Sequence, residues 1–325
     1  MNSPRVLCLG EVLFDCLADQ LGRSLETVES WTPYPGGAPA NVASALVKLG
    51  TPAAFIGCVG PYTPGDALVE LLGNIGVDIT AIQRHPTAPT RQVYVVRSAT
   101  GEREFAGFGN FQTTEFADTY LQASQLPEKL FEDAEFLILG TLELAYKDSR
   151  QAIYKAIQLA NRYDVKIVLD VNWRPVFWPE LSEAKPLILD LLKHIDFLKL
   201  SVEEAEWLFD TTDAGAINYR LSSVEGVLVT AGSQGCAYCL GEQEGKMPAF
   251  SVEVVDTTGA GDGFLAGFIH QLCLQGISCL KDPNISAQVI NYASAVGALT
   301  TTKAGAIASQ PTHSEVQEFL KGSGS

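Results

Sequence analysis

Val254-Val-Asp-Thr-Thr-Gly-Ala-Gly-Asp-Gly-Phe-Leu-Ala-Gly-Phe268 is the stretch that says most about the fold and chemistry of this chain. Its pattern predicts a strand that runs into a small-residue turn and then an amphipathic helix that begins near Asp262. The small residues Gly259, Ala260 and Gly261 allow consecutive backbone N–H groups to turn toward one point. Together with the helix dipole, such groups bind anionic oxygens. The stretch therefore predicts an anion site at a helix N-terminus.

Asp262 directly follows this predicted anion site. A carboxylate in that position can take a proton from an attacking hydroxyl group. An anion cradle with an adjacent base meets the main demands of phosphoryl transfer, which are positioning and neutralisation of charge. A purely structural interpretation fits the spacing equally well, with Asp262 as a helix N-cap and the glycines as a tight turn.

A second glycine-rich stretch, Tyr34-Pro-Gly-Gly-Ala-Pro-Ala-Asn-Val-Ala43, leads into another predicted helix. Gly36 and Gly37 allow a ligand to approach the backbone closely, and Asn41 offers both a donor and an acceptor. Asp15 follows the first predicted strand, and its carboxylate suits the hydroxyl groups of a sugar or polyol. Taken alone, the stretch is equally typical of a Pro-Gly turn at the start of a helix.

Short apolar runs alternate with longer amphipathic segments through most of the chain. Near-continuously apolar strands separated by helices are typical of a mostly parallel sheet covered by helices on both faces. Such α/β sheets bind ligands beyond the carboxyl ends of their strands. We expect strands at residues 5–9, 53–59, 136–139, 166–169, 197–200 and 226–230, and helices at 40–49, 66–75, 149–163, 185–192, 203–209, 263–275 and 286–301.

Two segments, at about 11–35 and 88–113, break this rhythm with alternating polar and apolar residues, as in Gln92-Val-Tyr-Val-Val96. A period of two is typical of strands that are exposed on one face. We therefore predict a small β-sheet lid, inserted in one α/β domain over residues 1–321 and followed by a tail at 322–325.

Composition excludes several classes of function. The chain has 325 residues, 46% of them apolar, which is enough to bury a large core. Its 22 Lys and Arg against 38 Asp and Glu give a net charge of −16, and such a surface repels nucleic-acid phosphates and anionic lipids. No segment approaches the ~18 uninterrupted apolar residues of a membrane span, and Glu11 and Asp15 break the pattern of a signal peptide. We expect a cytoplasmic protein without a nucleic-acid or membrane partner.

The seven cysteines are scattered along the chain, and Cys236 and Cys239 form the only close pair. Neither a second such pair nor a histidine partner completes a zinc set. Buried reduced thiols are therefore the favoured interpretation, with a metal or redox site at the pair as the alternative.

The two glycine-rich stretches together resemble both signatures of the PfkB (ribokinase-like) family of sugar kinases. Agreement extends from Gly10-Glu-Val-Leu-Phe-Asp15 to Thr300-Thr-Thr-Lys-Ala-Gly-Ala306, nearly the whole chain. The resemblance is strongest to bacterial and plant fructokinases, and it rests on four segments taken together: Gly36-Gly-Ala-Pro-Ala-Asn41, Gly101-Glu-Arg-Glu-Phe105, Asp170-Val-Asn-Trp-Arg174 and the threonine run at Thr300. The combination is far more specific than any single motif.

The resemblance implies a ribokinase-like fold and a role for each matching residue. Asp262 would be the general base beside an anion hole at Gly259, Ala260 and Gly261, and Arg174 would face the transferred phosphate. The sugar would be held by Asp15, Gly36, Gly37, Asn41, Arg103 and Asn172, and ATP by Ser201, Thr230, Gly232, Gly235 and Ser294. Mg²⁺ would be ordered through water by Glu204, and a monovalent cation such as K⁺ would be bound by Asp256, Thr258, Thr300, Lys303, Gly305 and Ser309.

Without the resemblance, three of these residues have ordinary structural interpretations. Asn172 fits a helix N-cap, Arg174 a surface ion pair, and Glu204 one side of a solvated acidic helix face. Ser201 also departs from the family, whose members commonly carry Asn at that position.

A second departure bears on the substrate. Fructokinases and 2-keto-3-deoxygluconate kinases often carry an Arg where this chain has Gly109. A sugar acid would therefore lack one cationic partner, which favours fructose. Another lid residue, Arg91 or Arg103, is a candidate to take the place of the missing cation.

We therefore predict an ATP-dependent fructokinase that yields fructose 6-phosphate. The alternatives are a kinase for 2-keto-3-deoxygluconate, ribose or a nucleoside, and a non-catalytic sugar- or nucleotide-binding regulator of the same fold. A nicotinamide dehydrogenase is excluded because the first strand runs into Gly10-Glu-Val-Leu-Phe-Asp15 and not into Gly-x-Gly-x-x-Gly. A half-exposed lid sheet also makes a homodimer through the lid a candidate assembly.

Overall fold

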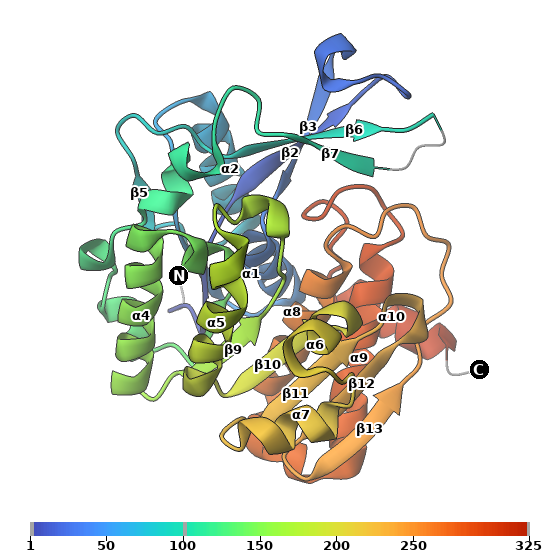
Figure 1. Cartoon of the computed structure of the whole chain (residues 1–325). Helices are drawn as coiled ribbons and strands as arrows, with labels where there is room; N and C mark the ends of the chain where they lie inside the picture. The colour runs from blue at the N-terminus through green and yellow to red at the C-terminus, as the bar shows by residue number, and fades with distance from the viewer. Residues whose placement is uncertain (1–2, 100–102, 324–325) are drawn as a thin grey trace.

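A computed structural model of the chain describes residues 3–99 and 103–323. Its larger sheet consists of β1 (Val6–Leu9), β4 (Ala53–Val59), β5 (Ile82–Arg84), β8 (Phe136–Leu139), β9 (Lys166–Asp170), β10 (Phe197–Ser201), β11 (Gly226–Thr230), β12 (Cys236–Leu240) and β13 (Gln243–Met247). The nine strands lie in the order β13-β12-β11-β10-β9-β8-β1-β4-β5 (Figure 1). Pairing is parallel from β11 to β5, and β12 and β13 are antiparallel additions at one edge. The predicted α/β class is confirmed.

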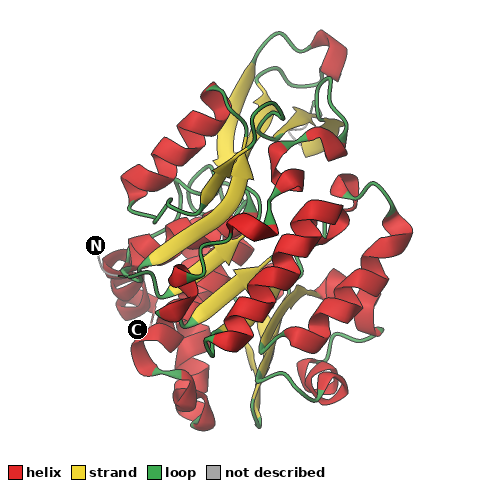
Figure 2. Ribbon diagram, turned by 90° about the vertical axis from the view of Figure 1, so that its left-hand side faces the viewer, coloured by secondary structure: helices red, strands yellow, loops and turns green. Residues whose placement is uncertain are grey.

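Helices cover both faces of this sheet (Figure 2). Alternation along β1 explains why: Val6 and Cys8 point into one hydrophobic cluster, and Leu7 and Leu9 point into the other. The first cluster is closed by α1 (Ala38–Leu49), α2 (Thr63–Ile75), α8 (Ala260–Gln275), α9 (Pro283–Thr300) and α10 (His313–Ser323). The second is closed by α3 (Lys129–Glu132), α4 (Lys147–Arg162), α5 (Leu181–Leu191), α6 (Val202–Phe209) and α7 (Ala214–Leu221).

The expected strands and helices of this body are present, and the differences have physical causes. No strand precedes the anion-site turn: Val254 and Val255 are 57% and 62% exposed, and the N–H of Val255 donates to the Thr301 carbonyl at 2.8 Å instead of joining a ladder. The following helix, α8, is buried on nearly all sides, so it is not amphipathic. At the chain's end, α10 continues through Ser323, beyond the expected start of the tail, and residues 324–325 lie outside the described part.

A smaller sheet forms above the larger one, at the top of Figure 1. It consists of β2 (Leu13–Ala18), β3 (Trp31–Gly36), β6 (Gln92–Arg97) and β7 (Arg103–Gly107), in the order β3-β2-β6-β7. Parallel pairing of β2 with β6 joins the two chain segments expected to form the lid. Gly101 and Glu102 of the quoted fructokinase-like motif lie outside the described residues.

Arg91 lies just before β6, at the base of the lid, and its side chain is completely buried. Its Nε and Nη2 donate to the two carboxylate oxygens of Asp118 at 2.6 and 3.0 Å. Its guanidinium carbon also lies 4.6 Å from the ring centroid of Phe116 and 5.3 Å from that of Phe177. A sugar contact for Arg91 is therefore wrong, because every face of its guanidinium is engaged within the protein.

We expect Arg91→Met to lower the free energy of unfolding by about 3–5 kcal/mol, because Asp118 would remain buried without its counter-charge. Chemical denaturation followed by circular dichroism measures this loss. Arg97→Met is the control, since the Arg97 side chain is on the lid and donates to the carbonyls of Ala18 and Asp19 there. Equal losses in the two variants would contradict the assigned role of the buried pair.

Candidate active site

A cavity of about 650 Å³ lies between the lid and the carboxyl edge of the larger sheet. Gly140 follows β8, and Asp170, Ser201 and Thr230 are the last residues of β9, β10 and β11. All four line the cavity. Parallel pairing of these strands brings their carboxyl ends to one edge, which is where the sequence places the ligand.

The lid forms the opposite wall of the cavity with every second side chain of its strands. Leu13, Asp15 and Leu17 alternate along β2 and face the cavity, whereas Cys16 points away from it and is buried. The other lining residues of the lid are Tyr34, Pro35, Val93, Val95, Arg103 and Phe105. The inner face is therefore largely apolar, with one carboxylate on β2 and one guanidinium on β7.

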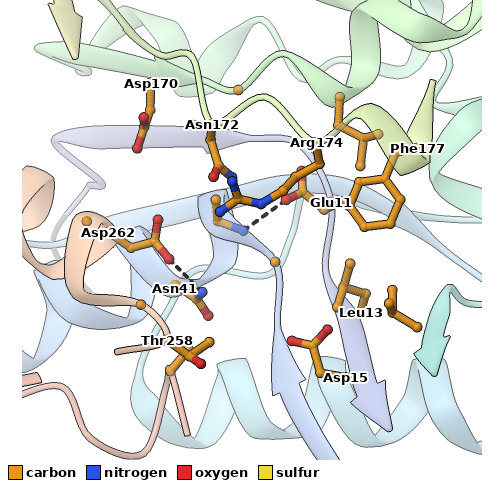
Figure 3. A pocket seen from close by; sticks show the side chains of 18 of the residues that line it. Glu11, Leu13, Asp15, Asn41, Asp170, Asn172, Arg174, Phe177, Thr258 and Asp262 are labelled. Carbon is orange, nitrogen blue, oxygen red and sulfur yellow. Dashed lines mark hydrogen bonds between the residues drawn. The ribbon is translucent and has the colours of Figure 1, made fainter. Parts of the chain in front are cut away.

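Asp262 is the third residue of α8 and lines the cavity with its carboxyl group buried. Its Oδ2 accepts a hydrogen bond from Asn41 Nδ2 at 2.7 Å (Figure 3). Burial and the nearby charge of Asp170 raise the pKa of Asp262 to about 6, although Asn41, Lys199 and Arg174 act in the opposite direction. A carboxylate with that pKa is ionised at neutral pH and remains basic enough to accept a proton.

The N-cap of α8 is Gly259, so the interpretation of Asp262 as a helix cap is wrong. Gly259 has φ of +79°, and a Cβ there would lie 2.9 Å from the Cβ of Ala306, which explains the need for glycine. Gly259 and Gly261 line the cavity. Ala260 does not line it, and its N–H donates to the Thr257 carbonyl at 3.2 Å.

A buried ion pair lies directly behind this turn. Lys199 Nζ contacts both carboxylate oxygens of Asp170, at 2.8 and 2.7 Å, and both side chains are more than 90% buried. Burial opposes the charge on Lys199, but Asp170, Glu204 and Asp262 together outweigh burial and raise the pKa of Lys199. A Cβ at Gly261 would lie 3.1 Å from Lys199 Nζ, so the ammonium group packs directly against the turn at Gly261. We did not select this residue from the sequence, where the signal was a lysine inside an otherwise apolar strand.

Asn172 and Arg174 lie on the loop that follows β9. Asn172 has φ of +35° and caps no helix, so the interpretation as an N-cap is wrong. Arg174 forms no ion pair with any residue of 3–99 or 103–323, so the interpretation as a surface ion pair is also not supported. Figure 3 shows the Arg174 guanidinium extending into the cavity, which Asp262 and Asp15 also line. Trp173, between them, stacks on Trp207 with ring centroids 3.9 Å apart, which anchors the loop on α6.

Glu204 is buried and lines the cavity, which contradicts a solvated acidic helix face. Its two oxygens accept the N–H groups of Ser201 and Trp173, each at 2.7 Å. A carboxylate has about four acceptor positions, so this arrangement leaves some free toward the cavity. Glu204 therefore fits the predicted water-mediated contact with Mg²⁺.

Gly36 and Gly37 of the second glycine-rich stretch lie too close to the segment after β1 for a side chain to fit. Gly37 has φ of +105°, and a Cβ there would lie 2.4 Å from the Glu11 carbonyl oxygen. A Cβ at Gly36 would lie 3.0 Å from Asp15 Oδ2. Burial raises the pKa of Asp15 to about 6, against the opposing effect of Arg103 and Arg174.

Glu11 is a lining residue that we did not select from the sequence. Its Oε1 accepts the N–H of Ala38 at 2.9 Å, at the first turn of α1. Burial raises the pKa of Glu11 to about 7, and nearby Asp118 adds to this effect. Glu143 is buried beneath it, and the pKa of Glu143 is raised by burial and by Glu11. Glu11 at the cavity and the nearby buried Glu143 are therefore both protonated more easily than usual.

Several predicted site residues do not line the cavity, namely Gly36, Gly232, Gly235, Ala260, Ser294, Thr300, Lys303 and Ser309. Gly235 shapes the turn after β11, where a Cβ would lie 2.0 Å from the Met247 carbonyl oxygen. Ser294 points its hydroxyl into a buried region of α9, where no described residue bonds to it. Thr300 donates to the Val296 carbonyl at 2.8 Å, and Lys303 pairs with Glu315 at 3.5 Å.

The predicted monovalent-cation set comes together only in part. Asp256, Thr258 and Gly305 line the cavity together. Asp256 Oδ1 accepts the N–H and hydroxyl of Thr258, and Asp256 Oδ2 accepts the N–H of Gly305 and a guanidinium N–H of Arg103. These four donors fill the acceptor positions of the carboxylate. A cation at Asp256 therefore does not fit without displacement of a donor.

Cys236 and Cys239 lie on opposite faces of β12, in different hydrophobic clusters, so they cannot share one metal ion. Six of the cysteines are buried and Cys279 is partly buried, all with free thiols. Within residues 3–99 and 103–323, no cluster of three or more His, Cys, Asp or Glu is arranged to hold a metal ion. The helices of that part include none with the length and apolar character of a membrane span.

Comparison with known proteins agrees with this geometry. The sequence pattern of the pfkB family of carbohydrate kinases matches residues 3–313. This chain belongs to that family. The kinase is 35% identical over 319 residues to fructokinase-1 of Zea mays, with 97% of each chain covered. A crystal structure of a fructokinase with bound ATP from Xylella fastidiosa superposes with a TM-score of 0.89 at 29% identity, covering 98% of this chain and 99% of that one.

A second solved structure shows which ligands a related enzyme binds. A fructokinase double mutant from Vibrio cholerae O395, in a form with bound fructose, ADP and potassium ion, superposes with a TM-score of 0.84 at 26% identity. The alignment covers 98% of each chain. The ribokinase-like fold is thereby confirmed, and this chain is a sugar kinase.

We expect Lys199→Met to lower the free energy of unfolding of the kinase by about 3–5 kcal/mol, because Asp170 would keep its buried charge without a partner. The double variant Lys199→Met/Asp170→Leu should recover most of the loss. Denaturant unfolding of the three proteins measures both effects. A double variant no more stable than Lys199→Met would show that lost packing, and not the unpaired carboxylate, causes the loss.

Proposed function

We propose that this kinase transfers the γ-phosphate of ATP to D-fructose and yields fructose 6-phosphate. The observation that carries the proposal is the position of Asp262, whose carboxylate faces the cavity beside the N-terminal turn of α8. A base beside backbone N–H groups is what transfer from ATP to a hydroxyl requires. The choice of fructose is supported by the names of the relatives. Gly109 supports fructose over a sugar acid, because the acid's carboxylate would lack a cationic partner there.

In the proposed reaction, Asp262 takes the proton of the C6 hydroxyl as the sugar oxygen attacks the γ-phosphorus. The bond between that phosphorus and the bridging oxygen of ADP breaks, and ADP leaves with the electron pair. Arg174 and the N–H groups near Gly259 and Gly261 stabilise the charge on the transferred phosphoryl group. The apolar inner face of the lid excludes water, which would otherwise compete with the sugar.

Sugar binding is proposed for Asp15, Gly37, Asn41 and Asn172. The Asn41 side-chain oxygen is buried, and no described residue donates to it. A sugar hydroxyl would satisfy this acceptor, while the Asn41 amide nitrogen holds Asp262. The sugar contacts of Gly36 and Arg103 stay predictions.

We propose that the nucleotide lies along the ends of β10 and β11, where Ser201 and Thr230 line the cavity. Contacts of the nucleotide with Gly232, Gly235 and Ser294 stay predictions. When bound with ATP, Mg²⁺ would neutralise phosphate charge, and Glu204 would hold it through water. The potassium ion bound by a relative supports a monovalent cation near Asp256, provided that one of the hydrogen-bond donors to Asp256 is displaced.

The outer face of the lid is the proposed surface for a homodimer. Because Val93 and Val95 face the cavity, Tyr94 between them lies on the outer face, where Trp31 packs edge-on at 4.9 Å. Two such faces can pair through their aromatic side chains. A cytoplasmic location also stays a prediction.

We expect MgATP turnover to depend on fructose and to fall at least about a hundredfold in Asp262→Asn, because the amide cannot accept the proton. ADP release with fructose, ribose, 2-keto-3-deoxygluconate, adenosine and no acceptor measures this dependence. Glu203→Gln is the matched control, since Glu203 is exposed on α6 beside the site. Preference for another acceptor would overturn the choice of fructose. Nucleotide or sugar binding without turnover would support a non-catalytic regulator.

We expect kcat/KM to decrease as the pH falls through about 6. Burial raises the pKa of Asp262 to about 6, so the base is protonated and inactive below that pH and ionised above it. Asp15 titrates in the same range, so Asp15→Asn should retain the decrease with a slope of one proton. A profile that stays flat down to pH 5 would contradict Asp262 as a base with a raised pKa.

A further inference from the structure

Arg103 connects the lid to the loop that precedes the anion-binding turn. Its Nη1 donates to Thr258 Oγ1 at 2.7 Å, and its Nη2 donates to Asp256 Oδ2 at 3.1 Å. Thr258 directly precedes Gly259, the N-cap of α8. The two bonds therefore hold β7 of the lid against the loop on which the anion hole depends.

The Asp256 carboxylate is ionised and fully hydrogen-bonded in this arrangement. Burial opposes its ionisation, but bonds from Thr258, Gly305 and Arg103 outweigh burial and lower the pKa of Asp256 to about 2. Thr258 and Gly305 belong to the loops around Asp256 and donate from short, local groups. Arg103 is the only one of the donors that comes from the lid.

Arg103 is also the donor that is most easily displaced. Its side chain is 46% exposed, whereas the Asp256 side chain is 9% exposed. Among the residues of 3–99 and 103–323, Asp256 forms an ion pair with Arg103 and with no other. Two cations at one carboxylate repel each other, so a second cation would compete with Arg103 instead of adding to it.

We propose that Arg103 is a positioning residue that acts as the resident counter-ion of Asp256, and that a monovalent cation binds there only by displacing it. This inference rests on the proposed function, because the role of the anion hole in nucleotide binding is itself part of that proposal. Without a bound cation, the lid orders the loop before the anion hole. The position of the lid and the affinity for nucleotide are then linked through one guanidinium group.

The test compares the wild type with Arg103→Gln, Arg103→Lys and Arg97→Gln. Arg97 pairs directly with Arg103 across β6 and β7, but it bonds to the carbonyls of Ala18 and Asp19. It is therefore a matched control from the same sheet. Arg103→Lys keeps the positive charge but lacks the planar group that donates to Asp256 and Thr258 at the same time. This variant replaces Arg103→Gln in the test if Arg103→Gln does not fold.

Two measurements are made on each protein at constant ionic strength, with tetramethylammonium replacing potassium. The first is the unfolding temperature as a function of K⁺ without any ligand, which reports cation binding to the folded chain. The second is the Kd for MgADP by calorimetry, with and without K⁺. Neither measurement needs phosphoryl transfer.

We expect K⁺ to stabilise Arg103→Gln at about tenfold lower concentration than the wild type, because no charge-assisted bond must be displaced. Without K⁺, Arg103→Gln should bind MgADP about tenfold more weakly than the wild type, and K⁺ should restore its affinity. Arg97→Gln should match the wild type in both measurements, and Arg103→Lys should fall between the two.

The same K⁺ response in the wild type and in Arg103→Gln would overturn the inference, because Arg103 would not occupy the cation's place. A difference in K⁺ response, with no MgADP binding by any of the proteins, would support the counter-ion role. It would also contradict the proposed nucleotide site. The two failures are therefore distinguishable.

Discussion

The buried ion pair between Lys199 and Asp170 is the interaction on which the rest of the site depends. It joins adjacent strands, β10 and β9, at the carboxyl edge of the sheet. Lys199 lies under Gly261, so one ammonium group compensates Asp170 and packs against the turn of α8. Burial raises the pKa of Asp262, Asp170 adds to this effect and Lys199 opposes it, so the pair also contributes to the proton affinity of Asp262. The same ion pair therefore affects both the stability of the sheet edge and the basicity of Asp262.

The lid is attached by two arginines of opposite character. Arg91 is fully buried with Asp118 and surrounded by aromatic rings, so it fixes the base of the lid to the α/β body. Arg103 is half exposed and forms an ion pair with Asp256, which belongs to the loop before α8. A fully buried pair is costly to break, whereas a pair with one partner exposed is weakened more by solvent and salt. The lid thus has one fully buried attachment and one that is partly exposed.

Much of the fold was predictable from the sequence because the strands are buried on both faces. Continuous apolar runs such as β4 and β8 are fully buried only in the interior of a sheet that is covered on both faces. The segments between these runs are long enough to form the covering helices. Val254 and Val255 show the limit of this argument, since the same composition lies on the surface when no neighbouring strand is available. Glycine positions were also informative, because Gly37 and Gly259 have positive φ values that other residues rarely adopt.

Sequence by itself determined the α/β class, the inserted lid and the two motifs that supply Asp262 and Asn41, because periodicity and glycine spacing are local properties of the chain. Tertiary structure alone decided which polar and charged side chains pair with one another. Asn41 and Asp262 are 221 residues apart, and Arg103 and Asp256 are 153 apart. Pairings of this kind depend on how helices and strands pack, and no local pattern encodes them. For the same reason Lys199 was apparent only after folding placed β9, β10 and α8 together.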